Sequence, residues 1–280
     1  MTDAFQKPVT VADVAKVMER IAPMDLAESW DNCGLQLGSR RWPVKKILVA
    51  LDPLDEVLQA AVERQADMVI THHPLLIKPM RNIDVETPVG RIIGRALCGE
   101  IAVYAAHTNL DSAEKGINDM LAAALELKAV EALVPAEAPS VKAPESRLVG
   151  MGRVGRVAPA MPLEAFAQHV KARLKLTRLK MAGDPRMLVD CVAVCSGSGT
   201  SLLADFLGSP AQVYVSGDLR YHDARAVDAA ERALIDVGHF PSEHIMVETL
   251  VAQLSAAMQT AGWQVAVEAC RVEQDPFEWR

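Results

Sequence analysis

The sequence predicts an α/β protein with largely parallel β-sheets covered by helices on both faces, and two observations carry this prediction. Short runs of apolar, β-branched residues alternate with segments of helical periodicity along most of the 280 residues. The expected strands are nearly continuous in apolar residues, as is typical of strands that helices cover on both sides. Hydrophobic residues make up 50% of the chain, which is enough apolar material for a sizeable core.

The first half of the chain opens with an expected helix over residues 10–22. Val11, Val14, Met18 and Ile21 share one face of this helix, and Thr10 precedes them as an N-cap. Strand and helix patterns then alternate. Strands are expected over 46–52, over 67–73 and from 101, and helices over 55–65, 88–100 and 116–127.

The alternation is interrupted once and then resumes. Residues 128–147 are rich in Pro, Ala and Glu and show little periodicity, which indicates a connection between domains or an excursion into solvent. Beyond them, strands are expected over 149–157, 187–195, 211–218, 233–239 and 263–270. Helices are expected over 162–174, 221–233 and 241–262, together with a glycine loop and helix over 196–208.

Composition and charge argue against several classes of protein. A net charge of −7 does not suit a surface that coats nucleic acid, which is usually basic, although it permits a small anionic substrate. The five cysteines include no CxxC pair, which argues against a zinc ribbon or a disulfide framework. The N-terminus is charged and amphipathic, and no apolar run approaches the ~18 residues of a membrane span. The sequence thus predicts a soluble, reduced, cytoplasmic protein.

Side chains that bind metal ions well follow three of the expected strands. In an open parallel sheet, ligands gather at the carboxyl ends of the strands, so we expect all three strand ends at one edge of one sheet. These side chains are His72 and His73 after the strand at 67–73, His107 and Asp111 after the strand from 101, and His239 and Glu243 after the strand at 233–239.

Each of these residues also has an ordinary structural explanation. A single histidine at a strand end is often a hydrogen-bonded core or turn residue. Polar pairs four residues apart, such as His239 and Glu243, are common at the starts of helices. The joint placement after three strands is what favours a metal site.

The adjacent pair His72 and His73 indicates more than one ion. Successive side chains of an extended segment point to opposite sides, so the two imidazoles are expected to diverge. Diverging rings suit two neighbouring ions, and the carboxylates of Asp111 and Glu243 could each bridge such a pair. Pro74 would fix the turn that follows. Imidazole and carboxylate donors together suit Zn, Mn, Fe, Co or Ni better than Ca or Mg.

Five segments, taken together and in order, resemble those of a known family. The chain resembles the GTP cyclohydrolase 1 type 2 homologues, also called Nif-three-like proteins, in their short form without the extra inserted domain. The matching segments are "AESWDNCGLQLG" (27–38), "THHPLL" (71–76), "AHTNLDSAEKGIND" (106–119), "VSGDLRYHDA" (215–224) and "GHFPSE" (238–243).

The resemblance implies a Nif-three-like fold of two α/β domains, each a three-layer α/β/α sandwich. We place the metal-binding domain at residues 1–127 plus 239–280 and the second domain at residues 128–238. The resemblance also implies a homohexamer, a trimer of dimers, whose ring has its metal sites facing an internal cavity.

The resemblance further implies a dinuclear centre. His107 matches a family histidine close to the metals, which would be a ligand or a nearby base. Two divalent metal ions per chain would be held at the matching positions His72, His73, Asp111, His239 and Glu243.

The implied activity is that of a metal-dependent hydrolase resembling GTP cyclohydrolase 1 type 2. A hydroxide bridging the two ions would attack a carbon or phosphorus centre of a nucleotide-like or other small substrate, with His107 or Glu243 as the catalytic proton-transfer partner. The alternative is a non-catalytic protein that binds or delivers metal, or serves as a scaffold. No motif in the sequence indicates recognition of a guanine base, so the sequence does not identify the substrate.

Three further motifs have two interpretations each. The loop at Trp30, Asp31 and Asn32 could line the cavity near the metals or simply form a turn. The glycines of 195–201 fit a tight strand-to-helix turn, with an anion nest as the alternative. Asp218 and His222, near another strand end, could contact substrate or cap a helix.

Overall fold

Two units make up the part of the chain that the computed structural model describes, residues 7–137 and 148–278. Unit 1 falls within Met1–Asn109 and Val247–Pro276, and unit 2 falls within Leu110–Met246 and Phe277–Arg280. Each unit has its own β-sheet, so the predicted two-domain α/β fold is confirmed. The division into domains at 1–127 plus 239–280 and 128–238 stays a prediction.

The sheet of unit 1 has five strands in the order β1-β4-β3-β2-β11. β1 is antiparallel to β4, and the other neighbours are parallel, as the apolar strand patterns predict. The strands are β1 (Gly34–Leu37), β2 (Lys46–Ala50), β3 (Met68–Thr71), β4 (Ala102–Ala105) and β11 (Ala266–Ala269). The helices are α1 (Val11–Ile21), the short 3₁₀ helix η1 (Met24–Leu26), α2 (Asp55–Glu63), α3 (Pro88–Cys98) and α10 (Met246–Thr260).

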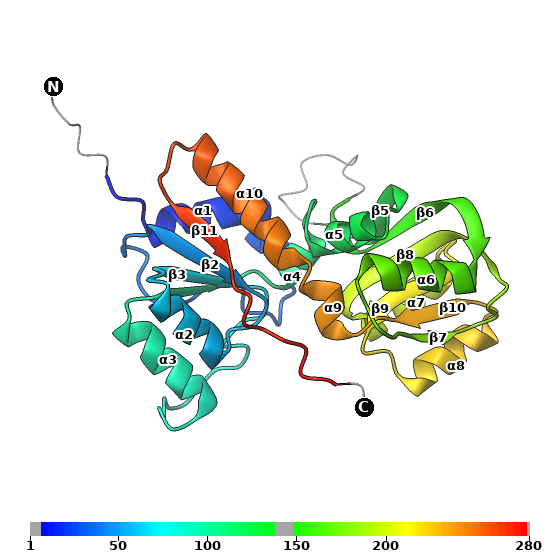
Figure 1. The fold of residues 1–280 in the computed structure, drawn as a ribbon, viewed down its shortest axis with the longest axis horizontal. Helices are drawn as coiled ribbons and strands as arrows, with labels where there is room; N and C mark the ends of the chain where they lie inside the picture. Colours follow the sequence, from blue (N-terminus) through cyan, green and yellow to red (C-terminus); the bar gives the residue numbers. More distant parts are fainter. Residues whose placement is uncertain (1–6, 138–147, 279–280) are drawn as a thin grey trace. The chain divides into compact units, whose positions relative to one another are not determined.

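Helices cover both faces of this sheet. Apolar residues of α2 and α3 pack on one face against alternate residues of β2, β3 and β4, among them Leu48, Val69 and Val103. The intervening residues, such as Ile47 and Ile70, are fully buried and point to the opposite face, because successive strand side chains alternate. Figure 1 shows α1 and α10 on that opposite side.

The register of the parallel strands brings three strand ends to one edge of the unit 1 sheet. Ala50 at the end of β2 pairs with Thr71 of β3, and Thr71 pairs with Ala105 of β4. The residues that follow each strand therefore leave the sheet at the same level.

The sheet of unit 2 has six strands in the order β5-β6-β8-β9-β10-β7. Only β8, β9 and β10 run parallel to one another, and the remaining pairs are antiparallel, so this sheet is more mixed than predicted. The strands are β5 (Lys128–Pro135), β6 (Gly150–Pro162), β7 (Lys180–Ala182), β8 (Leu188–Ser198), β9 (Val213–Gly217) and β10 (Ala233–Asp236). The helices are α5 (Ile117–Ala124), α6 (Leu163–Arg173), η2 (Gly199–Leu202), α7 (Leu203–Gly208), α8 (Tyr221–Ala229) and α9 (His239–Glu243), while α4 (Thr108–Ser112) begins in unit 1.

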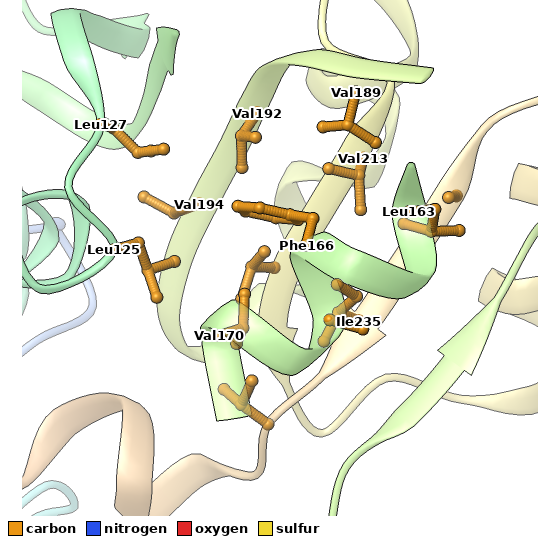
Figure 2. Packing of buried hydrophobic residues seen from close by; sticks show 14 of the residues in the cluster. Leu125, Leu127, Leu163, Phe166, Val170, Val189, Val192, Val194, Val213 and Ile235 are labelled. Carbon is orange, nitrogen blue, oxygen red and sulfur yellow. The ribbon is translucent and has the colours of Figure 1, made fainter. Parts of the chain in front are cut away.

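Each face of the unit 2 sheet has its own core. Phe166 of α6 is fully buried against Val192, Val194 and Val213 of the sheet, as Figure 2 shows. On the other face, residues of α7 and α8 pack against the alternate strand positions, and Phe206 stacks on Tyr214 with ring centroids 5.1 Å apart. The result is the expected three-layer arrangement.

Three predictions about elements were wrong. The connection predicted over 128–147 begins with β5, which pairs with β6; the rest of it, 138–147, lies outside the described residues. The single helix predicted over 241–262 is two helices, α9 and α10, separated by a turn at His244 and Ile245. The strand before His239 belongs to the unit 2 sheet, whereas β3 and β4 belong to that of unit 1, so the three strand ends do not share one sheet.

Among the residues that the structure describes, no helix combines the length and the apolar character that a membrane crossing requires.

Replacing Phe166 by Ala should destabilise unit 2. The ring is fully buried, so its removal leaves a cavity and should lower the free energy of unfolding by about 3–5 kcal/mol. Leu188→Ala is the control, because Leu188 is 62% exposed in the neighbouring β8 and should cost less than ~1 kcal/mol. Urea unfolding followed by circular dichroism measures both; equal losses would contradict this packing.

Candidate metal centre

Three histidines gather at the carboxyl edge of the unit 1 sheet. His72 and His73 follow β3, and both of their backbone N–H groups donate to the carbonyl of Leu51, at 3.1 and 3.0 Å. The chain therefore bends here instead of staying extended, and the expected divergence of the two rings is wrong. Their ring centroids lie 5.0 Å apart, and that of His107, after β4, lies 5.1 and 5.5 Å from them.

Each of these imidazoles is held through its Nδ1 atom. Nδ1 lies 2.9 Å from the carbonyl of Ala106 in His72, 2.7 Å from Asp52 in His73 and 3.0 Å from Asp31 in His107. An acceptor at Nδ1 assigns the proton to that nitrogen and leaves the Nε2 lone pair to bind a ligand.

The three rings could hold a metal ion. One ring nitrogen of each lies within 4.8 Å of the others, and the three side chains range from buried to partly buried. His107 thus joins His72 and His73 in one group.

Asp31 fixes His107 from a loop before β1. Its carboxylate has no exposed surface, and Thr108 donates to it through both its backbone N–H and its hydroxyl, at 3.0 and 2.5 Å. Burial opposes ionisation, but hydrogen bonds from His107, Thr108 and Cys33 hold the pKa of Asp31 well below its usual range. Burial and the bond to Asp31 raise the pKa of the Cys33 thiol to about 11.

Glu273 supports the other side of the unit 1 group. This buried carboxylate accepts hydrogen bonds from the backbone N–H of Leu51, at 2.9 and 3.1 Å, and of Asp52, at 2.7 Å. It therefore fixes both the carbonyl that bends the chain at His72 and the aspartate that orients His73. Burial raises the pKa of Glu273, although these backbone bonds oppose the rise.

In unit 2, His239 lies between two carboxylates. Its Nε2 is 3.0 Å from Glu243 one turn along α9, and its Nδ1 is 2.8 Å from Asp218, which follows β9. Asp218 has a φ of 53°, a left-handed conformation that Asp tolerates and that turns its side chain toward α9. The bond to Glu243, with the charges of Glu243 and Asp218, raises the pKa of His239 to about 9 against the opposing effect of burial.

The end of β8 leaves room for this pair. Gly197 has a φ of +62°, and a Cβ there would lie 2.1 Å from Glu243 Oε1 and 3.3 Å from His239 Nε2. The backbone N–H of Gly197 donates to the Ser242 hydroxyl, which in turn donates to the carbonyl of His239. The glycine therefore leaves the space that the carboxylate occupies. β8 runs on to Ser198, so the strand extends into the turn predicted at 195–201.

Asp111 lies on α4, at the start of the described part of unit 2. Asn118 donates to its backbone carbonyl at 3.1 Å and accepts from the N–H of Ser196 at 2.9 Å, which ties α4 to the end of β8. Burial, followed by the charges of Asp111 and Glu243, raises the pKa of the Cys195 thiol to about 12.

The remaining histidines do not join these groups in the structure. His169 contacts the carbonyl of Leu125 at 3.1 Å, and His244 stacks on Phe240. His222 lies edge-to-face with Tyr221 at the start of α8.

Sequence reasoning missed several supporting residues. Asp52 follows β2 at the same edge as the histidines, so the strand-end rule could have found it. In the sequence, Gly197 is only one of several glycines in a predicted turn. Glu273 carried none, because it acts on Leu51 from 222 residues away.

The donor set fits a divalent transition metal. Imidazole nitrogens with fixed Nδ1 atoms and carboxylate oxygens are features of sites for Zn, Mn, Fe, Co or Ni. The identities of the individual ligands stay a prediction.

The fold and these groups define a two-domain α/β protein with histidine and glutamate side chains that could bind a metal. The chain belongs to the Duf34/NIF3 (NGG1p interacting factor 3) family, whose model matches residues 9–276. The resemblance seen in the five sequence segments is thereby confirmed.

Known proteins similar to this chain agree with that assignment. A Streptomyces coelicolor protein named GTP cyclohydrolase 1 type 2 homolog is 34% identical over 272 residues, covering 95% of this chain and 93% of its own. The crystal structure of a Bacillus cereus protein related to NIF3 has a TM-score of 0.91 at 25% identity, covering 98% of this chain and 100% of its own. A Staphylococcus aureus hypothetical protein has a TM-score of 0.90 at 28% identity, with the same coverage.

Gly197→Ala should weaken metal binding at least tenfold, with a loss of stability similar to that of Gly262→Ala. The added methyl group displaces the flexible Glu243 carboxylate, while the left-handed backbone costs about 1–2 kcal/mol. Gly262→Ala is the matched control, because Gly262 has a φ of +71° and open space around its Cβ position. Chelator competition and thermal unfolding measure the two effects; equal metal affinity in both variants would contradict this role of Gly197.

The stability that His239 contributes to the metal-free protein should depend on pH. Its folded pKa of about 9 lies above the unfolded value of 6.5, so the contribution is complete below pH 6.5 and is lost as pH rises through 9. Since the side chain is 35% exposed, we expect His239 to contribute about 1–2 kcal/mol to the free energy of unfolding. This is less than the pKa shift alone would give, because solvent screens the charges.

Denaturation in EDTA at pH 6 and pH 9.5 tests this. The advantage of the wild type over His239→Asn should shrink at the higher pH, and a constant difference would contradict the assignment. Because an ion must displace the Nε2 proton, metal affinity should rise over the same range.

Proposed function

We propose that this protein binds two divalent metal ions through His72, His73, Asp111, His239 and Glu243 and uses them to hydrolyse a small substrate. One observation carries the proposal: four imidazoles, those of His72, His73, His107 and His239, have Nδ1 held by an acceptor. Fixed Nδ1 atoms are typical of metal-ligating histidines, because the acceptor sets the tautomer and the ring orientation.

The chemistry follows from the donor set. A pair of divalent ions, when bound, lowers the pKa of a water molecule toward neutrality and polarises a substrate oxygen. Asp31, Asp52 and Asp218 hold the Nδ1 atoms of His107, His73 and His239, whose Nε2 atoms would then be the ones to bind the ions. Glu243, whose carboxylate lies beside His239 Nε2, is the residue we assign to proton transfer at its Oε atoms. The grouping of His107 with His72 and His73 favours a ligand role for it over that of a base.

The substrate class comes from relatives. Proteins about 30% identical to this chain are named GTP cyclohydrolase 1 type 2 homolog, so GTP and related nucleotides are the first substrates to test. A homohexameric ring with inward-facing metal sites, expected from the family resemblance, is part of the proposal. A reducing cytoplasmic location is a further part, and all five cysteines have free thiols.

The test begins with metal content. The protein loaded with Mn or Zn should retain about two ions per chain, by elemental analysis, and should have the mass of a hexamer in solution. The loaded protein is then screened for hydrolysis of GTP, other nucleotides and phosphoesters. Asp111→Ala should lower turnover at least a hundredfold. Asp228→Ala, which removes an exposed carboxylate paired with Arg225 on α8, should leave it unchanged.

Each result discriminates between functions. Retained metal without turnover of any substrate would favour the non-catalytic alternative of metal binding, delivery or scaffolding. Failure to retain metal would contradict the proposed centre itself.

A further inference from the structure

The loop that holds His107 also presents an exposed tryptophan. Trp30 is 60% exposed, and its indole lies edge-to-face with the His107 imidazole, with ring centroids 6.0 Å apart and an interplanar angle of 79°. We propose that Trp30 is a stacking platform that binds a planar heteroaromatic ring of the ligand at the unit 1 histidine group. The inference rests on the proposed function, because the metal ion that would bind the other end of this ligand is part of that proposal.

Backbone and side-chain hydrogen bonds fix the loop on both sides of Trp30. The N–H of Asp31 donates to the carbonyl of Glu28, and the N–H of Glu28 donates to the Thr108 hydroxyl, both at 2.9 Å. The Asp31 carboxylate accepts from Thr108 and His107. These bonds fix the backbone on both sides of Trp30 and so place the base of its side chain beside His107. A preorganised loop loses little conformational entropy when a ligand binds.

The same loop is tied to the segment that follows His73. The Asn32 side-chain amide donates to the carbonyl of Leu76 at 2.6 Å, and the N–H of Leu76 donates to Gln36 Oε1 at 3.1 Å. The loop before β1 and the loop after β3 are thus joined to each other, so the backbone that carries Trp30 is tied to the segment that carries His73.

Exposure of the indole points to a ligand. A single exposed apolar side chain is ordinary, but Trp is large and its burial would be favourable. Here the indole is left in water by a loop that is otherwise fixed, and it touches a candidate metal ligand. Small-molecule sites combine apolar and aromatic side chains with a few polar groups that orient the ligand, and Trp30 beside the histidine group is such a combination.

The chemistry of the two parts defines the ligand class. An indole face binds planar aromatic rings by stacking, and purine and pyrimidine bases are examples. A metal ion held by the neighbouring imidazoles would coordinate an oxygen atom of the same ligand. Stacking accepts any base because every base has a π-face, so Trp30 would select for a ring without selecting guanine.

Binding of matched probes tests the platform. Guanosine 5′-monophosphate, adenosine 5′-monophosphate and ribose 5-phosphate are titrated into zinc-loaded protein, because the third probe lacks only the base. The wild type should bind both nucleotides at least about tenfold more tightly than ribose 5-phosphate. Trp30→Ala should abolish this difference and leave ribose 5-phosphate binding unchanged, whereas Trp30→Phe should keep most of it.

Two controls separate the platform from other effects. Trp42→Phe changes a tryptophan that packs over Gly38 in unit 1 and should bind all three probes like the wild type. Nucleotide-dependent quenching of tryptophan fluorescence should persist in Trp42→Phe and disappear in Trp30→Phe.

The outcomes are distinct from those of the proposed function. The inference is overturned if the wild type binds the nucleotides no more tightly than ribose 5-phosphate, or binds no probe. Equal weakening of all three probes by Trp30→Ala also overturns it. Elemental analysis of each sample reports separately on the metal centre, so loss of metal counts against the proposed function and not against the platform.

Discussion

The hydrogen bond at Nδ1 of each imidazole is the constraint on which the candidate centre depends. An unrestrained imidazole has two tautomers and rotates freely, so it would present a metal with the wrong nitrogen much of the time. Here Asp31, Asp52 and Asp218 remove that freedom for three histidines, and a backbone carbonyl does so for His72. The acceptors at Nδ1 therefore matter for metal binding as much as the candidate ligands themselves do.

The two sheets explain how these acceptors come to be in place. The parallel register of β2, β3 and β4 lines up the residues after each strand, which brings Asp52 beside His73. In unit 2, parallel β9 and β10 likewise bring Asp218 beside His239. Helices packed on both faces of each sheet hold the strand ends in place. In each unit, the apolar core therefore determines where the polar residues that follow the strands lie.

Buried carboxylates are the cost of this arrangement. Glu273 and Asp31 are withdrawn from water, which raises the energy of their charged forms, and each is compensated by several hydrogen bonds. Asp31 contacts His107 directly, whereas Glu273 acts on the histidines through Leu51 and Asp52. The bonds of Asp31 to Thr108 and His107 also fix the loop that carries Trp30 beside His107.

The sequence by itself determined the α/β class, most of the elements and the six candidate residues at strand ends, because apolar periodicity and strand-end polarity are local signals. Only the tertiary structure decided that β10 joins a second sheet, that residues 128–135 form a strand, and that His72 and His73 converge on a bend. It also decided the roles of Gly197 and Glu273. Those features arise from contacts between distant segments, and no periodicity in the chain encodes which distant carbonyl or carboxylate will meet a given backbone N–H.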